Sequence, residues 1–174
     1  TQNDPGLLGG VASRAATLGL HASLTLSADS LARAKELVGE SGIPGVHVHV
    51  AEDKADPADS LAKAGVRTVE RLHSAGLLGP GTIAAHCVWV DDDEVKLLAE
   101  TGTKVVHNPS SNMNNAVGRT DVARLRAAGV TLAVGSDGMT GDILSQLAQA
   151  YLVRRDAAGD PRVGWDDAAA FLEG

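Results

Sequence analysis

Histidine and acidic residues of this sequence are of the types that metal-assisted hydrolysis needs. The main candidates are His21, His49 with Glu52, His86 and Asp137. Imidazole nitrogens and carboxylate oxygens are common ligands of a catalytic divalent ion. A carboxylic acid beside such an ion carries the protons that hydrolysis of an amide or amidine moves. These residues therefore make a metal-dependent hydrolase a candidate function.

Each of these residues also has an explanation that involves no chemistry. His47 and His49 form an H-x-H on a predicted strand, where both imidazoles point to one face, and that face could simply meet solvent. Glu52 could begin an exposed acidic loop, His86 could be a hydrogen-bonded core histidine, and Asp137 could be a turn residue. The functional interpretation is favoured because His49, His86 and Asp137 each lie at the C-terminal end of a predicted strand.

Short apolar runs alternate with longer amphipathic stretches along the chain. The apolar runs predict strands at residues 18–24, 46–50, 82–87, 103–107 and 130–134. Helices are predicted at 31–38, where Ser27 is an N-cap candidate, and at 59–76, 92–100, 121–128, 142–154 and 165–172. Residues 108–119 are predicted to form a polar loop, which begins with Asn108.

Strict alternation of strands and helices means a parallel sheet, which is either open or part of a closed barrel. The C-terminal ends of all strands meet at one mouth in a (β/α)8 barrel, so polar residues at those ends favour the barrel. A full barrel needs about eight units and roughly 250 residues. The 174 residues therefore predict an α/β fold class, a partial TIM barrel with about strands four to eight. We expect residues 1–155 to be this C-terminal barrel part and 156–174 a C-terminal extension.

Composition limits the partners of the protein. The formal net charge of -7, with no basic run, argues against nucleic-acid binding. No apolar stretch approaches the roughly 18 residues of a membrane helix, so no membrane association is expected. The single Cys87 cannot form an internal disulfide, and the cytoplasm is the expected location.

The first and fifth predicted strands would leave open edges. We therefore expect either a fragment of a longer molecule or a homo-oligomer paired through these edges.

The order and spacing of the motifs resemble the amidohydrolase superfamily, in particular its deaminase and chlorohydrolase-like group and most closely the SsnA-type aminohydrolases. The matching segments are VHVAE at 48–52, AHC at 85–87, NPSSN at 108–112, GSDG at 135–138 and GLHA at 19–22. The H-x-H on strand one, which supplies two metal ligands in that family, has no counterpart before His21.

The resemblance implies one divalent metal ion, with zinc favoured over iron. It implies that His49 and Asp137 are metal ligands and that His86 is a further candidate ligand. Asp137 would also act as a general base, and His86 would stabilise charge that develops on the substrate. Glu52 would contact the substrate and shuttle a proton to the ring nitrogen and the leaving group.

The resemblance further implies that His21, Asn108 and Asn112 contact a small-molecule substrate. The expected function is an aminohydrolase or deaminase that breaks a C–N bond of a small heterocyclic compound, with the isolated fragment inactive because two strand-one ligands are missing. The alternative is a non-catalytic α/β scaffold or assembly module that keeps the histidines for packing. An H-x-H roughly 150 residues upstream in the full-length gene would favour the enzyme, by the eight-unit size of a complete barrel.

Overall fold

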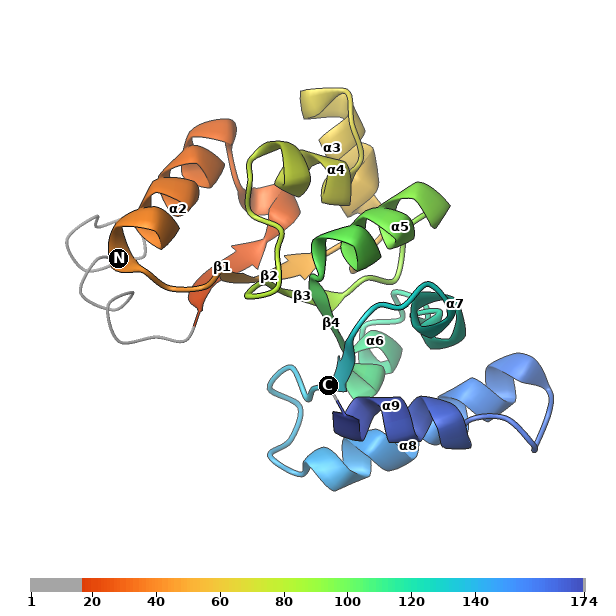
Figure 1. The fold of residues 1–174 in the computed structure, drawn as a ribbon. Helices are drawn as coiled ribbons and strands as arrows, with labels where there is room; N and C mark the ends of the chain where they lie inside the picture. The colour runs from red at the N-terminus through yellow and green to blue at the C-terminus, as the bar shows by residue number, and fades with distance from the viewer. Residues whose placement is uncertain (1–16, 174) are drawn as a thin grey trace.

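Five parallel strands form one sheet in which spatial order follows sequence order (Figure 1). The computed structural model describes residues 17–173, so the expected barrel part is seen only from residue 17 onward. The strands are β1 Leu18–Ala22, β2 Val46–Val50, β3 Ile83–His86, β4 Lys104–His107 and β5 Leu132–Val134. The α/β class and the parallel sheet are confirmed.

The register of the strands brings their C-terminal ends level with one another. Val50 pairs with His86 across β2 and β3, and His107 pairs with Val134 across β4 and β5. Side chains that follow these positions therefore leave the sheet at the same edge. This alignment is what allows residues far apart in sequence to form one site.

Strand β2 shows why the two faces of the sheet differ. Val46, Val48 and Val50 are at most 1% exposed, whereas His47 is exposed and His49 is partly exposed. Alternate side chains of a strand point to opposite faces, so the valines pack into the core and both histidines face the other way. Figure 1 shows α2 to α5 grouped on one side of the strands.

The connecting segments are mostly helical. They are η1 Ser23–Thr25, α2 Ala28–Ser41, α3 Ala55–Ala64, α4 Thr68–Ser74, α5 Asp92–Thr101, α6 Pro109–Asn114, α7 Val122–Ala127, α8 Ile143–Ala158 and α9 Trp165–Glu173. Helix α2 begins where the Ser27 hydroxyl accepts a hydrogen bond from the Ser30 backbone, as its N-cap position predicted. Among residues 17–173, no helix combines the length and the apolar character that crossing a bilayer requires.

Several predicted elements differ from the structure in extent, and three of these differences change the kind or number of elements. The helix expected at 59–76 is two helices, because Gly65 adopts a left-handed conformation with φ of 70° and ends α3. The polar loop expected at 108–119 contains α6, which begins at Pro109, a residue whose fixed φ suits the first helical turn. The first strand ends at Ala22 and gives way to η1.

One buried carboxylate joins the C-terminal helices to one another and to α7. Asp167 of α9 is 4% exposed and accepts hydrogen bonds from Arg126 Nε of α7 at 2.8 Å and Arg154 Nε of α8 at 2.9 Å. Helix α9 also contacts β5. Residue 155, the expected boundary of the extension, lies inside α8, and the division into two regions stays a prediction.

Candidate metal and catalytic site

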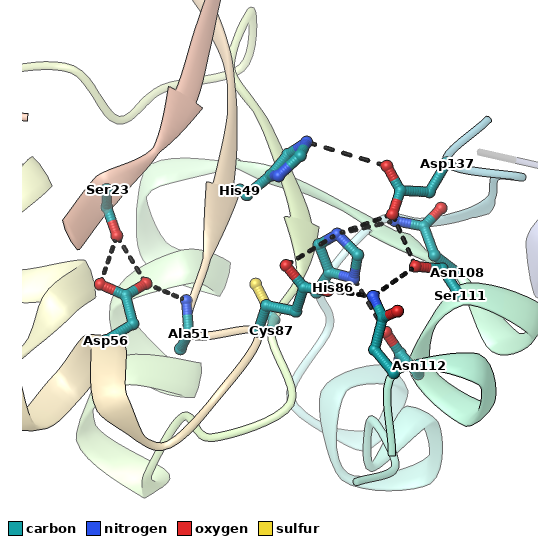
Figure 2. Close-up of polar contacts among 12 residues, drawn as sticks. Ser23, His49, Ala51, Asp56, His86, Cys87, Asn108, Ser111, Asn112 and Asp137 are labelled. Carbon is teal, nitrogen blue, oxygen red and sulfur yellow. Dashed lines mark hydrogen bonds and ion pairs between the residues drawn. The ribbon is translucent and has the colours of Figure 1, made fainter. Parts of the chain in front are cut away.

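Three of the predicted site residues meet at the C-terminal edge of the sheet (Figure 2). His49 comes from β2, His86 ends β3, and Asp137 follows β5. One potential ligand atom from each lies within 4.8 Å of the other two. The nearest pairs are His86 Nε2 to Asp137 Oδ2 at 3.7 Å and His49 Nε2 to Asp137 Oδ1 at 4.0 Å. The predicted convergence of these strand ends is confirmed.

Unusual backbone conformations mark the points where the chain leaves the strands. Ala51, His86, Cys87 and Asp137 all have positive φ angles, between 47° and 72°. Residues with a side chain rarely adopt this left-handed region, and such strain concentrates at functional sites because the surrounding contacts must hold it. The turns aim the side chains of His86 and Asp137 at one another.

A buried carboxylate supports the turn after β2. Asp56 is 2% exposed and accepts hydrogen bonds from the Ala51 backbone at 2.7 Å and from the Ser23 hydroxyl. Burial raises the pKa of Asp56, and the bonds from Ser23 and Ala51 oppose this effect. Figure 2 shows the bonds from Asp56 to Ser23 and Ala51. They hold the positive-φ residue Ala51, which precedes Glu52 in the sequence.

His86 lies at the centre of the site. Its side chain is fully buried, and its Nδ1 is 2.8 Å from Asn112 Oδ1. Its Nε2 faces two carboxylates, Glu52 Oε2 at 3.8 Å and Asp137 Oδ2 at 3.7 Å. The Asn108 amide nitrogen is 3.5 Å from the same Nε2. Glu52 and Asn108 therefore join the cluster, as their sequence positions predicted.

Helix α6 and Asn115, which follows it, supply contacts that the sequence did not predict. Ser111 donates a hydrogen bond of 2.6 Å from its hydroxyl to Asp137 Oδ2, and Asn115 donates one of 3.2 Å to Glu52 Oε1. Asn112 is 2% exposed. Its side-chain amide forms hydrogen bonds at both ends, with His86 through the oxygen and with Thr120 through the nitrogen. The polar composition of residues 108–115 was the available signal, but it indicated a loop.

Two other histidines occupy different surroundings. His21 is exposed on β1, with its ring centroid 5.7 Å from that of His49, so it lies beside the cluster. His107 is 2% exposed and stacks on Phe171 with 6.0 Å between ring centroids. Burial is the main cause that lowers the pKa of His107 to about 4. His107 is therefore a neutral core histidine.

The donor set fits a divalent metal ion. Burial lowers the pKa of His49, the nearby His86 adds to this effect, and Asp137 opposes it; the neutral imidazole is the form that binds metal. Two ligands about 2.0–2.1 Å from a tetrahedral ion are about 3.4 Å apart. The separations are 3.7 Å from His86 Nε2 to Asp137 Oδ2 and 4.0 Å from His49 Nε2 to Asp137 Oδ1, and the three ligand atoms lie within 4.8 Å of one another. The three side chains would therefore move closer together on binding one ion.

The sequence matches known proteins along most of its length. The model of the amidohydrolase family matches residues 6–172. The chain is 36% identical over 152 residues to the 5-methylthioadenosine/S-adenosylhomocysteine deaminase of Symbiobacterium thermophilum, which covers 84% of this chain and 35% of that protein. It is 38% identical over 148 residues to the 5'-deoxyadenosine deaminase of Methanothermobacter thermautotrophicus, with 83% and 34% covered. The chain thus spans about a third of the length of these relatives.

Solved structures share the fold. A zinc-bound adenosine deaminase from Xanthomonas campestris superposes with a TM-score of 0.76 at 30% identity, covering 90% of this chain and 38% of that one. Guanine deaminase from E. coli gives a TM-score of 0.75 at 25% identity, covering 86% and 37%. The sheet is therefore part of a (β/α)8 barrel, as the sequence predicted.

Proposed function

The chain belongs to the amidohydrolase family, and we propose that it carries part of the active site of a metal-dependent deaminase. The observation that carries this proposal is the meeting of His49, His86 and Asp137 with their ligand atoms within 4.8 Å. The proposed reaction replaces an amino group on a heterocyclic carbon with oxygen from water and releases ammonia. The relatives named above are deaminases of 5'-modified adenosines, and we propose an adenine nucleoside of this class as the substrate.

We propose zinc as the metal, held by His49 and Asp137 with His86 as a third ligand. The nitrogen and oxygen donors suit zinc, and the adenosine deaminase with a similar fold contains zinc. A divalent ion at this position supplies Lewis-acid activation of water at neutral pH.

Two carboxylates are placed to move protons. Glu52 Oε2 and Asp137 Oδ2 both lie within 4 Å of His86 Nε2, so they are close enough to reach one small substrate. We assign Asp137 to accept a proton from the attacking water and Glu52 to deliver a proton to the ring nitrogen. Asn115 and Ser111 hold the two carboxylates through one hydrogen bond each.

Substrate contacts are proposed at the rim of the cluster. His21 is exposed next to His49, and Asn108 brings its amide to the same side of His86 as the carboxylates. His21, whose Nδ1 is 3.5 Å from the Thr25 hydroxyl, is therefore placed to contact the sugar or ring of a bound nucleoside. Asn108 can donate a hydrogen bond to an acceptor atom of that ligand.

Ammonia release tests the proposed function. Full-length protein is stripped of metal, reloaded with zinc and mixed with 5'-deoxyadenosine, with Asp137→Asn as the inactive control. Zinc-dependent release in the wild type that is lost in the variant would support the proposal. A folded, zinc-loaded protein that releases no ammonia from adenine nucleosides would contradict it and favour the non-catalytic module.

A further inference from the structure

His86, Asn112 and Thr120 form a closed ring of hydrogen bonds. His86 Nδ1 is 2.8 Å from Asn112 Oδ1. Asn112 Nδ2 is 3.2 Å from Thr120 Oγ1. The Thr120 hydroxyl is in turn 2.8 Å from the backbone carbonyl oxygen of His86. The ring thus begins and ends on the same residue, through a side chain at one end and the main chain at the other.

The carbonyl group of His86 decides the direction of every bond in this ring. A carbonyl oxygen only accepts, so the single proton of the Thr120 hydroxyl points at it. Thr120 Oγ1 must then accept from Asn112, which places the Asn112 NH2 group on that side. The Asn112 amide oxygen therefore faces His86, and because this oxygen also only accepts, His86 Nδ1 must carry a proton.

We propose that Asn112 and Thr120 are positioning residues that set the tautomer of the neutral His86 ring, with the proton on Nδ1 and the lone pair on Nε2. The lone pair faces Asp137 and Glu52, where the cluster converges. The substrate contact expected for Asn112 stays a prediction, and both ends of its side-chain amide are engaged in the ring. Its consequence for catalysis rests on the proposed function, whereas the tautomer itself does not.

Burial makes the ring selective for one arrangement. His86 is 0% and Asn112 2% exposed, so water does not offer replacement partners for the bond between them, and Thr120 is 7% exposed. Turning the Asn112 amide over would set the NH2 group against the protonated Nδ1 and leave Thr120 with one proton for two acceptors. Each mismatch leaves a buried polar group unsatisfied. The strained φ of 72° at His86 adds a reason for the bond from Thr120 to its carbonyl.

Nuclear magnetic resonance of the imidazole nitrogens tests the tautomer directly. The chain contains six histidines, so the signals of His86 in ¹⁵N-histidine-labelled full-length protein are assigned by their loss in His86→Gln. The metal-free wild type, recorded at alkaline pH where the imidazole is neutral, is expected to give a protonated-type signal for Nδ1 and an unprotonated-type signal for Nε2. A wild-type His86 with its proton on Nε2 would overturn the proposal.

Substitutions of Thr120 separate the hydroxyl from the packing. Thr120→Val keeps the shape of the side chain but removes the donor to the His86 carbonyl and the acceptor for Asn112. The valine methyl group can be accommodated, because Thr120 borders a cavity of about 280 Å³. We expect a mixture of His86 tautomers in Thr120→Val and the wild-type pattern in Thr120→Ser. A wild-type pattern in folded Thr120→Val would refute the role of Thr120, and Asn112→Leu tests Asn112 in the same way.

Kinetics then distinguish this inference from the proposed function. Loss of a partner that orients a metal-binding histidine typically costs about 10–100-fold in metal affinity or activity, and we expect kcat to fall by this amount in Thr120→Val with recovery in Thr120→Ser. An inactive wild type with the predicted Nδ1 proton would sink the proposed function alone. An active wild type with the proton on Nε2 would sink this inference alone.

Discussion

Ser111 and Asp137 are joined by a hydrogen bond of 2.6 Å between the serine hydroxyl and Oδ2 of the carboxylate. Ser111 lies in α6, and Asp137 follows β5 at a positive φ of 47°. The bond therefore ties the loop after the last strand to the helix after the preceding one. It fixes the carboxylate oxygen that lies 3.7 Å from His86 Nε2.

Removal of this bond should weaken the site. We predict that Ser111→Ala lowers zinc affinity or activity about 10–100-fold, the usual effect of losing a group that orients a metal ligand. Ser110→Ala is the matched control, because the Ser110 hydroxyl bonds Gln149 at 2.7 Å and not the cluster. Zinc titration and ammonia-release rates measure both variants. Equal zinc affinity and rates in Ser111→Ala and wild type would contradict the prediction.

Glu52→Gln should separate proton transfer from metal binding. The variant keeps the size of the side chain and its contact with Asn115 but cannot shuttle a proton. We predict a fall in kcat of about 10²–10⁴-fold with zinc affinity close to wild type. Asp53→Asn, at the neighbouring acidic residue, serves as the control and should change kcat little. A Glu52→Gln variant with wild-type kcat would remove Glu52 from the mechanism.

Asp56 should stabilise the fold beneath the site. Asp56→Ala leaves the buried Ala51 backbone donor and the Ser23 hydroxyl without a partner, and we predict a loss of about 1–3 kcal/mol in the free energy of unfolding. Asp56→Asn should lose less, because its amide oxygen can still accept from Ala51. Denaturant unfolding measures both. The prediction fails if the alanine variant is as stable as the wild type.

The stability of the protein should fall in mild acid because of His107. Its pKa is about 4 in the fold and about 6.5 when unfolded, so the unfolded chain binds the extra proton first as the pH falls. We predict that the free energy of unfolding drops by about 3 kcal/mol between pH 6.5 and pH 4 from this residue. Unfolding curves of wild type and His107→Leu across this range measure the difference. Parallel pH profiles for the two proteins would show that His107 makes no such contribution.

The sequence predicted those features that depend on local pattern. The alternation of valine and histidine predicted the bounds of β2. Polar residues at the C-terminal ends of the predicted strands were the candidates for the site. Because parallel strands in register end at one edge, the meeting of His49, His86 and Asp137 followed from these positions.

Features that depend on tertiary contacts could not be predicted in the same way. The segment PSSNMN is polar and resembles a loop, yet it forms α6 with Ser111 and Asn112 buried at 2% exposure each. Nothing local indicates that Ser111 bonds Asp137 or that Thr120 completes the ring around His86. His107 ends β4 and Asn108 follows it, but only Asn108 reaches the cluster, because the His107 ring stacks on Phe171 instead.

Anomalous diffraction at the zinc absorption edge, from crystals of the full-length protein grown with zinc, tests the central claim most directly. We predict one strong peak in contact with His49 Nε2 and an Asp137 carboxylate oxygen, at distances of about 2.0–2.2 Å. Crystals of the Asp137→Ala variant should lose the peak. A zinc peak away from His49 and Asp137, or a wild-type site without zinc at saturating concentration, would contradict the account.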